Sequence, residues 1–364
     1  MTTAPHRPDF RVPDPLPYDP AGPGPDFELP PGLEAAEPPE ARGVARDQVR
    51  LLAAGQDGLA HATFAALGRF LSPGDLLVVN TSATLAAAID GQRPGGRPVV
   101  VHFSTQLDNG RWLAELRPPG RATGPVTDAA AGERITLPAG ASLVLEAAAG
   151  TRLWRARLAA EAEPHAYLAV HGRPISYAYL HRRWPLRDYQ TVFARDPGSA
   201  EIPSAGRPFS TGLVTGLVTA GIVIAPITLH TGVSSLEAGE PPLPERFTVP
   251  AATAELVTLT RAAGRRVIAV GTTVTRALET AADRSGAGRD GIGPADGWTE
   301  LVLGPGRPAR VVDGIVTGWH APGASHLALL TAVAGPDRVA AAYAEAIRHG
   351  YLWHEFGDSC LLLR

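Results

Sequence analysis

Lysine is absent from this sequence of 364 residues, and all 33 basic side chains are arginine. They are balanced by 36 acidic side chains, so the formal net charge is only −3. A nearly neutral total excludes the broad basic field with which non-specific nucleic-acid binders hold phosphates. Any RNA site must therefore be a local patch. Arginine suits such a patch because its planar guanidinium matches phosphate geometry.

Cysteine and long apolar runs are also scarce. The single cysteine, Cys360, excludes a disulfide framework and every metal site built from several cysteines. No uninterrupted apolar run approaches the roughly 20 residues that a membrane helix needs. The proline-rich residues 1–42 lack the apolar centre of a signal peptide. These absences favour a cytoplasmic protein that makes no membrane contact.

Hydrophobic residues make up 45% of the chain, enough for a large core shared by two or three structural units. Residues 1–23 are expected to be extended or disordered because prolines dominate them. Residues 95–160 alternate short β-rich runs with Gly, Pro or Asp breaks, which is typical of a small barrel or sandwich. After about residue 172 strands alternate with helices, which indicates an α/β unit.

Several elements of that α/β unit can be predicted individually. We expect strands over 76–79, 221–229, 266–270 and 359–363, and helices over 251–263, from about 274 to 281 and from about 339 to 347. Gly271-Thr272-Thr273 lies between a strand and a helix. Such a turn offers unpaired N–H groups and two hydroxyls at a helix N-terminus, which suits a carboxylate or phosphate.

Two motifs suggest a ligand or metal site, but the residues around them do not support one. Residues 286–291 match G-x-G-x-x-G but follow a helix rather than a strand, so they predict a surface loop. His349 and His354 lie near Glu355 and Asp358, but their spacing matches no zinc pattern. We therefore predict no metal site from the sequence.

The run from residue 189 to 210 carries the most functional information. Tyr189-Gln190-Thr191-Val192-Phe193-Ala194, Gly198-Ser199 and Pro203-Ser204-Ala205-Gly206-Arg207-Pro208-Phe209-Ser210 follow one another in order. This run resembles Y-Q-T-V-[YF]-A…G-S…P-T-A-G-L-H-F-[ST] of the S-adenosylmethionine:tRNA ribosyltransferase-isomerase family. Further blocks resemble the family in the same order, so the resemblance spans about residues 24–364: 26–30, 46–51, 61–64, 74–80, 229–232, 270–279, 312–322 and 357–358.

The resemblance implies an α/β fold with a mixed-sheet main domain, residues 1–77 plus 173–364, and a small β-barrel inserted over residues 78–172. It also implies that S-adenosylmethionine serves as co-substrate and ribosyl donor, with no metal. A base removes the proton beside the sulfonium, and the aminomethyl group of a 7-deazaguanine in tRNA takes the rearranged ribosyl carbons. Methionine and adenine leave in this queuosine-pathway reaction. We expect a monomer or weak dimer that acts on tRNA.

This chemistry selects candidate residues from the matching blocks. The candidates for the general base are His230, Glu245, His320 and Asp358. We expect Gly271, Thr272, Thr273 and Arg276 to bind the methionyl carboxylate. The predicted wall of the ligand site consists of Pro203, Ser204 and Gly206, with Tyr189, Phe209 and Trp319 as aromatic shelves. The alternatives are that Tyr189 and Trp319 are core aromatics, and that Arg276 forms a helix-surface ion pair with Glu279.

Several polar positions of the family pattern are replaced here. Pro208 stands for the histidine of A-G-L-H-F, Leu243 for the histidine of M-H-x-E, and Gly318 for the asparagine of T-N-F-H. Apolar scaffold positions are retained. Two alternatives to the parent reaction therefore stay open. The first is a paralogue that passes the ribosyl carbons of S-adenosylmethionine to another acceptor, and the second is a non-catalytic protein that binds an adenosyl ligand or RNA.

Overall fold

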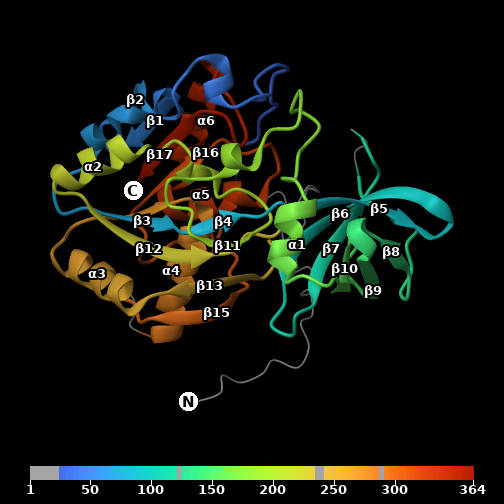
Figure 1. The fold of residues 1–364 in the computed structure, drawn as a ribbon. Helices are drawn as coiled ribbons and strands as arrows, with labels where there is room; N and C mark the ends of the chain where they lie inside the picture. Colours follow the sequence, from blue (N-terminus) through green and yellow to red (C-terminus); the bar gives the residue numbers. More distant parts are fainter. Residues whose placement is uncertain (1–23, 121–123, 234–241, 287–290) are drawn as a thin grey trace.

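The computed structural model describes residues 24–120, 124–233, 242–286 and 291–364. These residues form a nine-stranded mixed sheet covered by helices, and beside it a closed antiparallel barrel of six strands (Figure 1). The predicted fold class, an α/β main domain with a small β-barrel, is confirmed. None of the described helices is both long and apolar enough to cross a membrane.

The large sheet has the strand order β15-β13-β12-β3-β14-β16-β17-β1-β2. Its strands are β1 (Arg50–Gly55), β2 (Gly58–Thr63), β3 (Leu76–Asn80), β12 (Val223–Leu229), β13 (Glu245–Val249), β14 (Val267–Val270), β15 (Ala295–Thr299), β16 (Gly314–Gly318) and β17 (Ser359–Leu363). The central strands β12, β3, β14 and β16 run parallel to one another. Their carboxyl ends therefore meet at one edge of the sheet, which is where ligands bind in open α/β sheets.

Helices cover both faces of this sheet because its strands are apolar on both sides. Leu76 and Val78 pack into a core with α3 to α6, whereas Leu77 and Val79 of the same strand pack into a second core with α2. The α-helices of the main domain are α2 (Thr211–Thr219), α3 (Ala251–Ala262), α4 (Thr272–Ser285), α5 (Ser325–Ala334) and α6 (Pro336–Arg348). The strands and helices expected individually from the sequence are confirmed, with small shifts at their ends.

The barrel closes in the order β10-β7-β6-β5-β8-β9, and α1 (Pro164–His171) packs against it. Its strands are β5 (Ala88–Arg93), β6 (Arg97–Gln106), β7 (Trp112–Arg117), β8 (Arg134–Thr136), β9 (Ser142–Ala149) and β10 (Leu153–Ala159). Buried side chains fill its interior, among them Phe103 and Trp112, whose rings meet edge to face with centroids 5.4 Å apart. The barrel is therefore a packed core and not a ligand container.

The connection into the barrel begins later than predicted. The boundary expected at residue 78 falls inside β3, which is buried along its whole length in the large sheet. The next strand, β4 (Ser82–Thr84), pairs with β11 (Asp196–Ser199) outside the barrel. No turn signal interrupts the apolar run that contains residue 78, so the chain continues to the end of the strand before it leaves the sheet.

Short 3-10 helices connect these elements: Pro39–Arg42, Arg46–Gln48, Phe64–Phe70, Pro94–Gly96, Pro138–Gly140, Leu186–Tyr189 and Ser204–Gly206. The predictions for residues 1–23 and for the centre of the G-x-G-x-x-G loop, residues 287–290, lie outside the described residues.

Candidate active site

A cavity of about 320 Å³ lies at the carboxyl edge of the parallel strands. Val270 at the end of β14, residues 317–318 at the end of β16, and residues 231–233 after β12 form one side of it. The segments 174–179 and 200–205 form the other side. The cavity thus lies where the strand ends of the sheet meet the loops that lead back from the barrel.

The turn at Gly271 and the loop at Pro203 meet in this cavity, as predicted. Residues 203–205 and 270–273 all line it, and a Cβ atom placed on Gly271 would lie 3.3 Å from the Cβ of Ala205. Gly271 adopts φ 98°, a backbone conformation that favours glycine. Helix α4 begins directly afterwards at Thr272, and the first N–H groups of a helix have no intrahelical acceptor.

Two members of the predicted loop wall lie outside the cavity. Phe209 is fully buried and packs edge to face against Phe64 and Phe193, with ring centroids 5.0 and 5.2 Å away. Gly206 of the same loop is also buried. Phe209 is therefore a core aromatic, and the prediction that it forms a shelf for the ligand is wrong, because the loop turns its apolar end into the core under the sheet.

Arg276 lines the cavity but is already paired. Its Nε donates to the carbonyl oxygen of Leu301 at 3.1 Å, and one terminal nitrogen donates to the carbonyls of Leu243 and Thr299. The other terminal nitrogen pairs with the carboxylate of Glu245. The guanidinium has little capacity left for a ligand carboxylate, so Arg276 shapes the wall instead.

The alternative ion pair between Arg276 and Glu279 is also wrong. The Glu279 carboxylate accepts hydrogen bonds from the backbone N–H groups of residues 310–312 at 2.9 to 3.0 Å. Glu245, the actual partner of Arg276, lies in the cavity wall. Burial raises the pKa of Glu245 in spite of the neighbouring guanidinium.

His320 and His326 form a parallel stack in the cavity wall. Their ring centroids lie 4.4 Å apart with an interplanar angle of 0°, and His320 Nε2 lies 3.0 Å from Thr317 Oγ1. Burial lowers the pKa of His326 to about 4 and lowers the pKa of His320 well below its usual value. Both imidazoles are therefore neutral near pH 7. His326 was not predicted, because nothing in its sequence context marks it.

The other two predicted bases do not line the cavity. His230 follows β12, and its Nδ1 lies 2.7 Å from the hydroxyl of Ser82, which lies 2.6 Å from that of Ser199. A Cβ atom on Gly198 would lie 2.4 Å from His230 Nδ1, so this contact requires glycine at position 198. Burial lowers the pKa of His230 to about 4.

Asp358 is a structural tether and not a cavity residue. Its carboxylate accepts from the backbone N–H groups of Arg50 and Leu352, both at 2.8 Å. The Arg50 guanidinium donates to the same carboxylate at 2.7 and 2.9 Å. These contacts join the segment before β17 to the start of β1, and they leave the carboxylate no access to a ligand in the cavity.

The sequence did not predict a stack of three aromatic rings on the cavity wall. Tyr177 stacks on Tyr179 with centroids 5.9 Å apart, and Tyr179 stacks on His354 with centroids 4.3 Å apart. The two tyrosine hydroxyls donate to the carboxylates of Glu201 and Glu355. All five residues line the cavity, as does Tyr189. The Tyr-x-Tyr spacing was the available signal, but the contact with His354 joins segments 175 residues apart.

The charges on the cavity wall favour a cation. Three carboxylates line it, those of Glu201, Glu245 and Glu355, against a single guanidinium, that of Arg276. Burial raises the pKa of Glu355, and an incoming positive charge would stabilise its ionised form. In the described part of the chain, the one group of three His, Cys, Asp or Glu side chains close enough to hold a metal lies elsewhere, at His61, Glu345 and His349.

Comparison with known proteins places the chain in a family. The model of the queuosine biosynthesis protein family matches residues 25–362. The S-adenosylmethionine:tRNA ribosyltransferase-isomerase of Anaeromyxobacter dehalogenans is 38% identical, over 93% of this chain and 98% of its own length. That of Synechococcus elongatus is 37% identical, over 93% and 94%.

A solved structure agrees with this assignment. The crystal structure of the S-adenosylmethionine tRNA ribosyltransferase from Thermotoga maritima is similar with a TM-score of 0.51 and 27% identity. The alignment covers 93% of this chain and 99% of that protein. With both sequence and fold matched over nearly the whole length, the chain belongs to the queuosine biosynthesis protein family of S-adenosylmethionine:tRNA ribosyltransferase-isomerases.

Proposed function

We propose that this protein uses S-adenosylmethionine as a ribosyl donor and transfers the rearranged ribosyl carbons to the aminomethyl group of a 7-deazaguanine in tRNA. One observation carries the proposal: the family blocks at 203–205, 270–273 and 317–320 are far apart in the chain but line one cavity. Relatives that match over nearly their whole length carry this activity in their names.

The charge of the cavity supports a sulfonium ligand. Glu201, Glu245 and Glu355 line the cavity, and the guanidinium of Arg276 on the same wall pairs with Glu245. A positive sulfur held near these carboxylates lowers the energy of the complex because the surroundings are poorly solvated. The same carboxylates would receive the cationic aminomethyl group of the acceptor.

The start of α4 is the proposed site for the methionyl carboxylate. Thr272 and Thr273 line the cavity at the N-terminus of this helix of 14 residues. Free N–H groups, hydroxyls and the positive end of the helix dipole all favour an anion there. This assignment replaces Arg276, whose guanidinium is occupied by protein acceptors.

Glu245 and His320 remain the proposed candidates for proton transfer from the carbon beside the sulfonium. Both line the cavity, whereas His230 and Asp358 do not. A general base works best with a pKa near the working pH. Burial moves the pKa of Glu245 toward that range and the pKa of His320 away from it, so Glu245 is the stronger candidate.

The ring stack of Tyr177, Tyr179 and His354 is the proposed platform for a nucleobase. Adenine and 7-deazaguanine both have flat faces that stack on aromatic rings, and each such contact stabilises binding by about 1–3 kcal/mol. The stack lies on the same cavity wall as Glu201 and Glu355. The platform would therefore bring a base next to the carboxylates that receive the positive groups.

Product analysis tests the proposal. The purified protein is incubated with S-adenosylmethionine and tRNA that carries the aminomethyl-deazaguanine, and adenine and methionine are quantified by chromatography. We expect release that depends on this tRNA, with unmodified tRNA as the matched control. Release without tRNA would favour the paralogue with another acceptor. Binding of S-adenosylmethionine without release would favour the non-catalytic alternative.

A further inference from the structure

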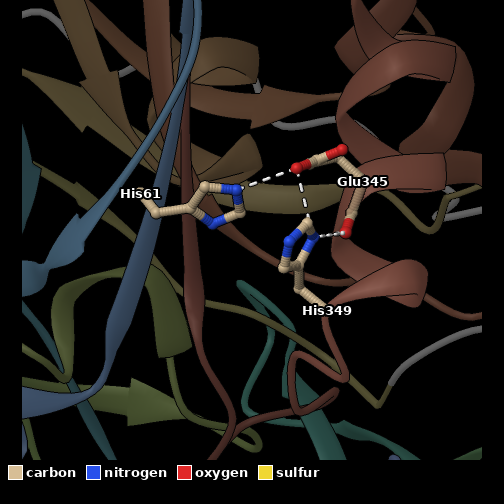
Figure 2. Close-up of side chains that lie close together, drawn as sticks. All are labelled: His61, Glu345 and His349. Carbon is tan, nitrogen blue, oxygen red and sulfur yellow. Dashed lines mark hydrogen bonds and ion pairs between the residues drawn. The ribbon is translucent and has the colours of Figure 1, made fainter.

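A second cluster of ionisable side chains lies away from the cavity. His61 projects from β2, Glu345 projects from the last turn of α6, and His349 directly follows that helix (Figure 2). None of the three lines the cavity described above. The cluster plays no part in the proposed ribosyl transfer.

The fold brings these residues together for simple reasons. His61 pairs with Leu52 across the β1–β2 hairpin, and paired residues point to the same face of a sheet. Leu52 belongs to the core on the α5 and α6 side, so His61 also faces α6. Glu345 and His349 are four residues apart, which places them on neighbouring turns of one helix face.

The three donor atoms are arranged as a metal site requires. His61 Nε2 lies 2.9 Å from Glu345 Oε1, and His349 Nδ1 lies 3.1 Å from the same oxygen. All three ligand atoms lie within 4.8 Å of one another. Tetrahedral zinc with bonds of about 2.0–2.1 Å places its ligands roughly 3.3 Å apart. The two distances to Glu345 Oε1 are within a few tenths of an ångström of this value, and the two imidazole nitrogens, which lie within 4.8 Å of each other, would close around the ion.

Tyr351 fixes His61 in the orientation that a metal ligand needs. Its hydroxyl lies 2.8 Å from His61 Nδ1 and donates to the carbonyl of Leu51 at 3.4 Å. When Nδ1–H donates to the tyrosine, the lone pair of Nε2 is available to a metal ion on the side of the Glu345 carboxylate. In that tautomer Nε2 and Glu345 Oε1 are two acceptors 2.9 Å apart, and a cation between them would stabilise the pair.

We propose that His61, Glu345 and His349 bind one zinc ion, with water completing the coordination and Tyr351 positioning His61. Two imidazoles and one carboxylate suit zinc better than calcium or magnesium, which prefer oxygen ligands alone. The ion links the edge strand β2 to the end of α6. The side chains of His61 and His349 are 41% and 43% exposed, so the ion exchanges with solvent.

Three neighbouring interactions compete with the ion. Arg348 pairs with Glu345, and Arg50 donates to the carbonyl of His349 at 2.9 Å. His349 Nδ1 also lies 3.1 Å from the carbonyl oxygen of Glu345, a contact that metal binding replaces. The positive charges weaken the site, so binding is reversible and chelators remove the ion.

Calorimetry of the full chain after treatment with a chelator tests the site. Titration with zinc chloride should give one ion per chain, and cobalt should give visible absorption bands of a low-symmetry nitrogen and oxygen site. We expect H61Q and H349Q each to weaken zinc binding at least about tenfold, and Y351F about tenfold, because removing an outer hydrogen bond costs that much. The matched control is H171Q, a histidine that stacks on Tyr167 of α1.

Thermal unfolding gives a second measurement that does not depend on activity. Zinc should raise the unfolding temperature of the wild type and of H171Q, but not that of H349Q. The exposed positions of His61 and His349 make both glutamine variants compatible with folding, which circular dichroism checks. Absence of stoichiometric zinc binding by the wild type overturns the proposal. Equal affinity of H349Q and H171Q also overturns it.

Discussion

The imidazole rings of His320 and His326 lie face to face in the cavity wall, with their centroids 4.4 Å apart. Both are neutral because burial lowers their pKa values, that of His326 to about 4. An unfolded chain holds its histidines near pKa 6.5. Between these values the unfolded state binds a proton that the folded state does not.

The free energy of unfolding should therefore fall as the pH decreases from about 6.5 to 4. The variant H326Q removes one of these histidines, and we expect it to lose less stability over this range, by up to about 3 kcal/mol. Urea unfolding at several pH values measures the difference. Burial raises the pKa values of Glu245 and Glu355, so these two carboxyl groups increase the stability of the folded state as the pH falls. Both groups are present in the wild type and in the variant, so they do not affect the difference between the two proteins. A slope identical to that of wild type would contradict the prediction.

Glu245 provides a test of the proposed proton transfer. E245Q keeps the size of the side chain but removes the carboxylate that pairs with Arg276. If Glu245 is the base, kcat for adenine release should fall by about 10² to 10⁴. The control is E255Q, an exposed position on α3. A normal kcat in E245Q would exclude Glu245 and leave His320 as the candidate.

Much of the fold could be predicted because its signals are local. The stripe of Val274, Ala277, Leu278 and Ala281 repeats with helical spacing, and these residues are indeed the buried face of α4. The β-rich runs before residue 160 are separated by turn residues, and they became barrel strands. The boundary near residue 78 was misplaced because no turn residue marks the point where the chain leaves the sheet.

The site was predicted only in part because its contacts are distant in sequence. Gly271 follows the central strand β14, so its place at the ligand edge could be predicted, and the family resemblance placed the loop at Pro203 beside it. Nothing in the sequence around Asp358 indicates that its carboxylate pairs with Arg50, which lies at the other end of the chain. The contact of Tyr179 with His354 was hidden for the same reason.

Asp358 is expected to matter for stability rather than for chemistry. D358N removes the charge that accepts from Arg50 and from two backbone N–H groups. Loss of hydrogen bonds to a charged group should lower the free energy of unfolding by about 2–3 kcal/mol. Urea denaturation measures this loss, with D57N in the β1–β2 turn as the control. A normal stability combined with lost adenine release would instead return Asp358 to the list of catalytic groups.

Two variants of Tyr179 distinguish the effect of ring stacking at the proposed platform from the effect of the tyrosine hydroxyl. Y179L removes the ring that lies between Tyr177 and His354 and holds the stack together, so a base stacked on the end of the platform should lose its support and its KM should rise by up to roughly 150-fold. Y179F keeps the ring but removes the hydroxyl that lowers the pKa of Glu355. The pKa of this carboxyl should then rise, and the acid limb of the pH profile should move to higher pH while KM stays near the wild-type value. Steady-state kinetics of both variants from pH 5 to 9 distinguish the two effects, with Y167F on α1 as the control. Equal KM values for Y179L and the wild type would show that this stack of rings supports no base.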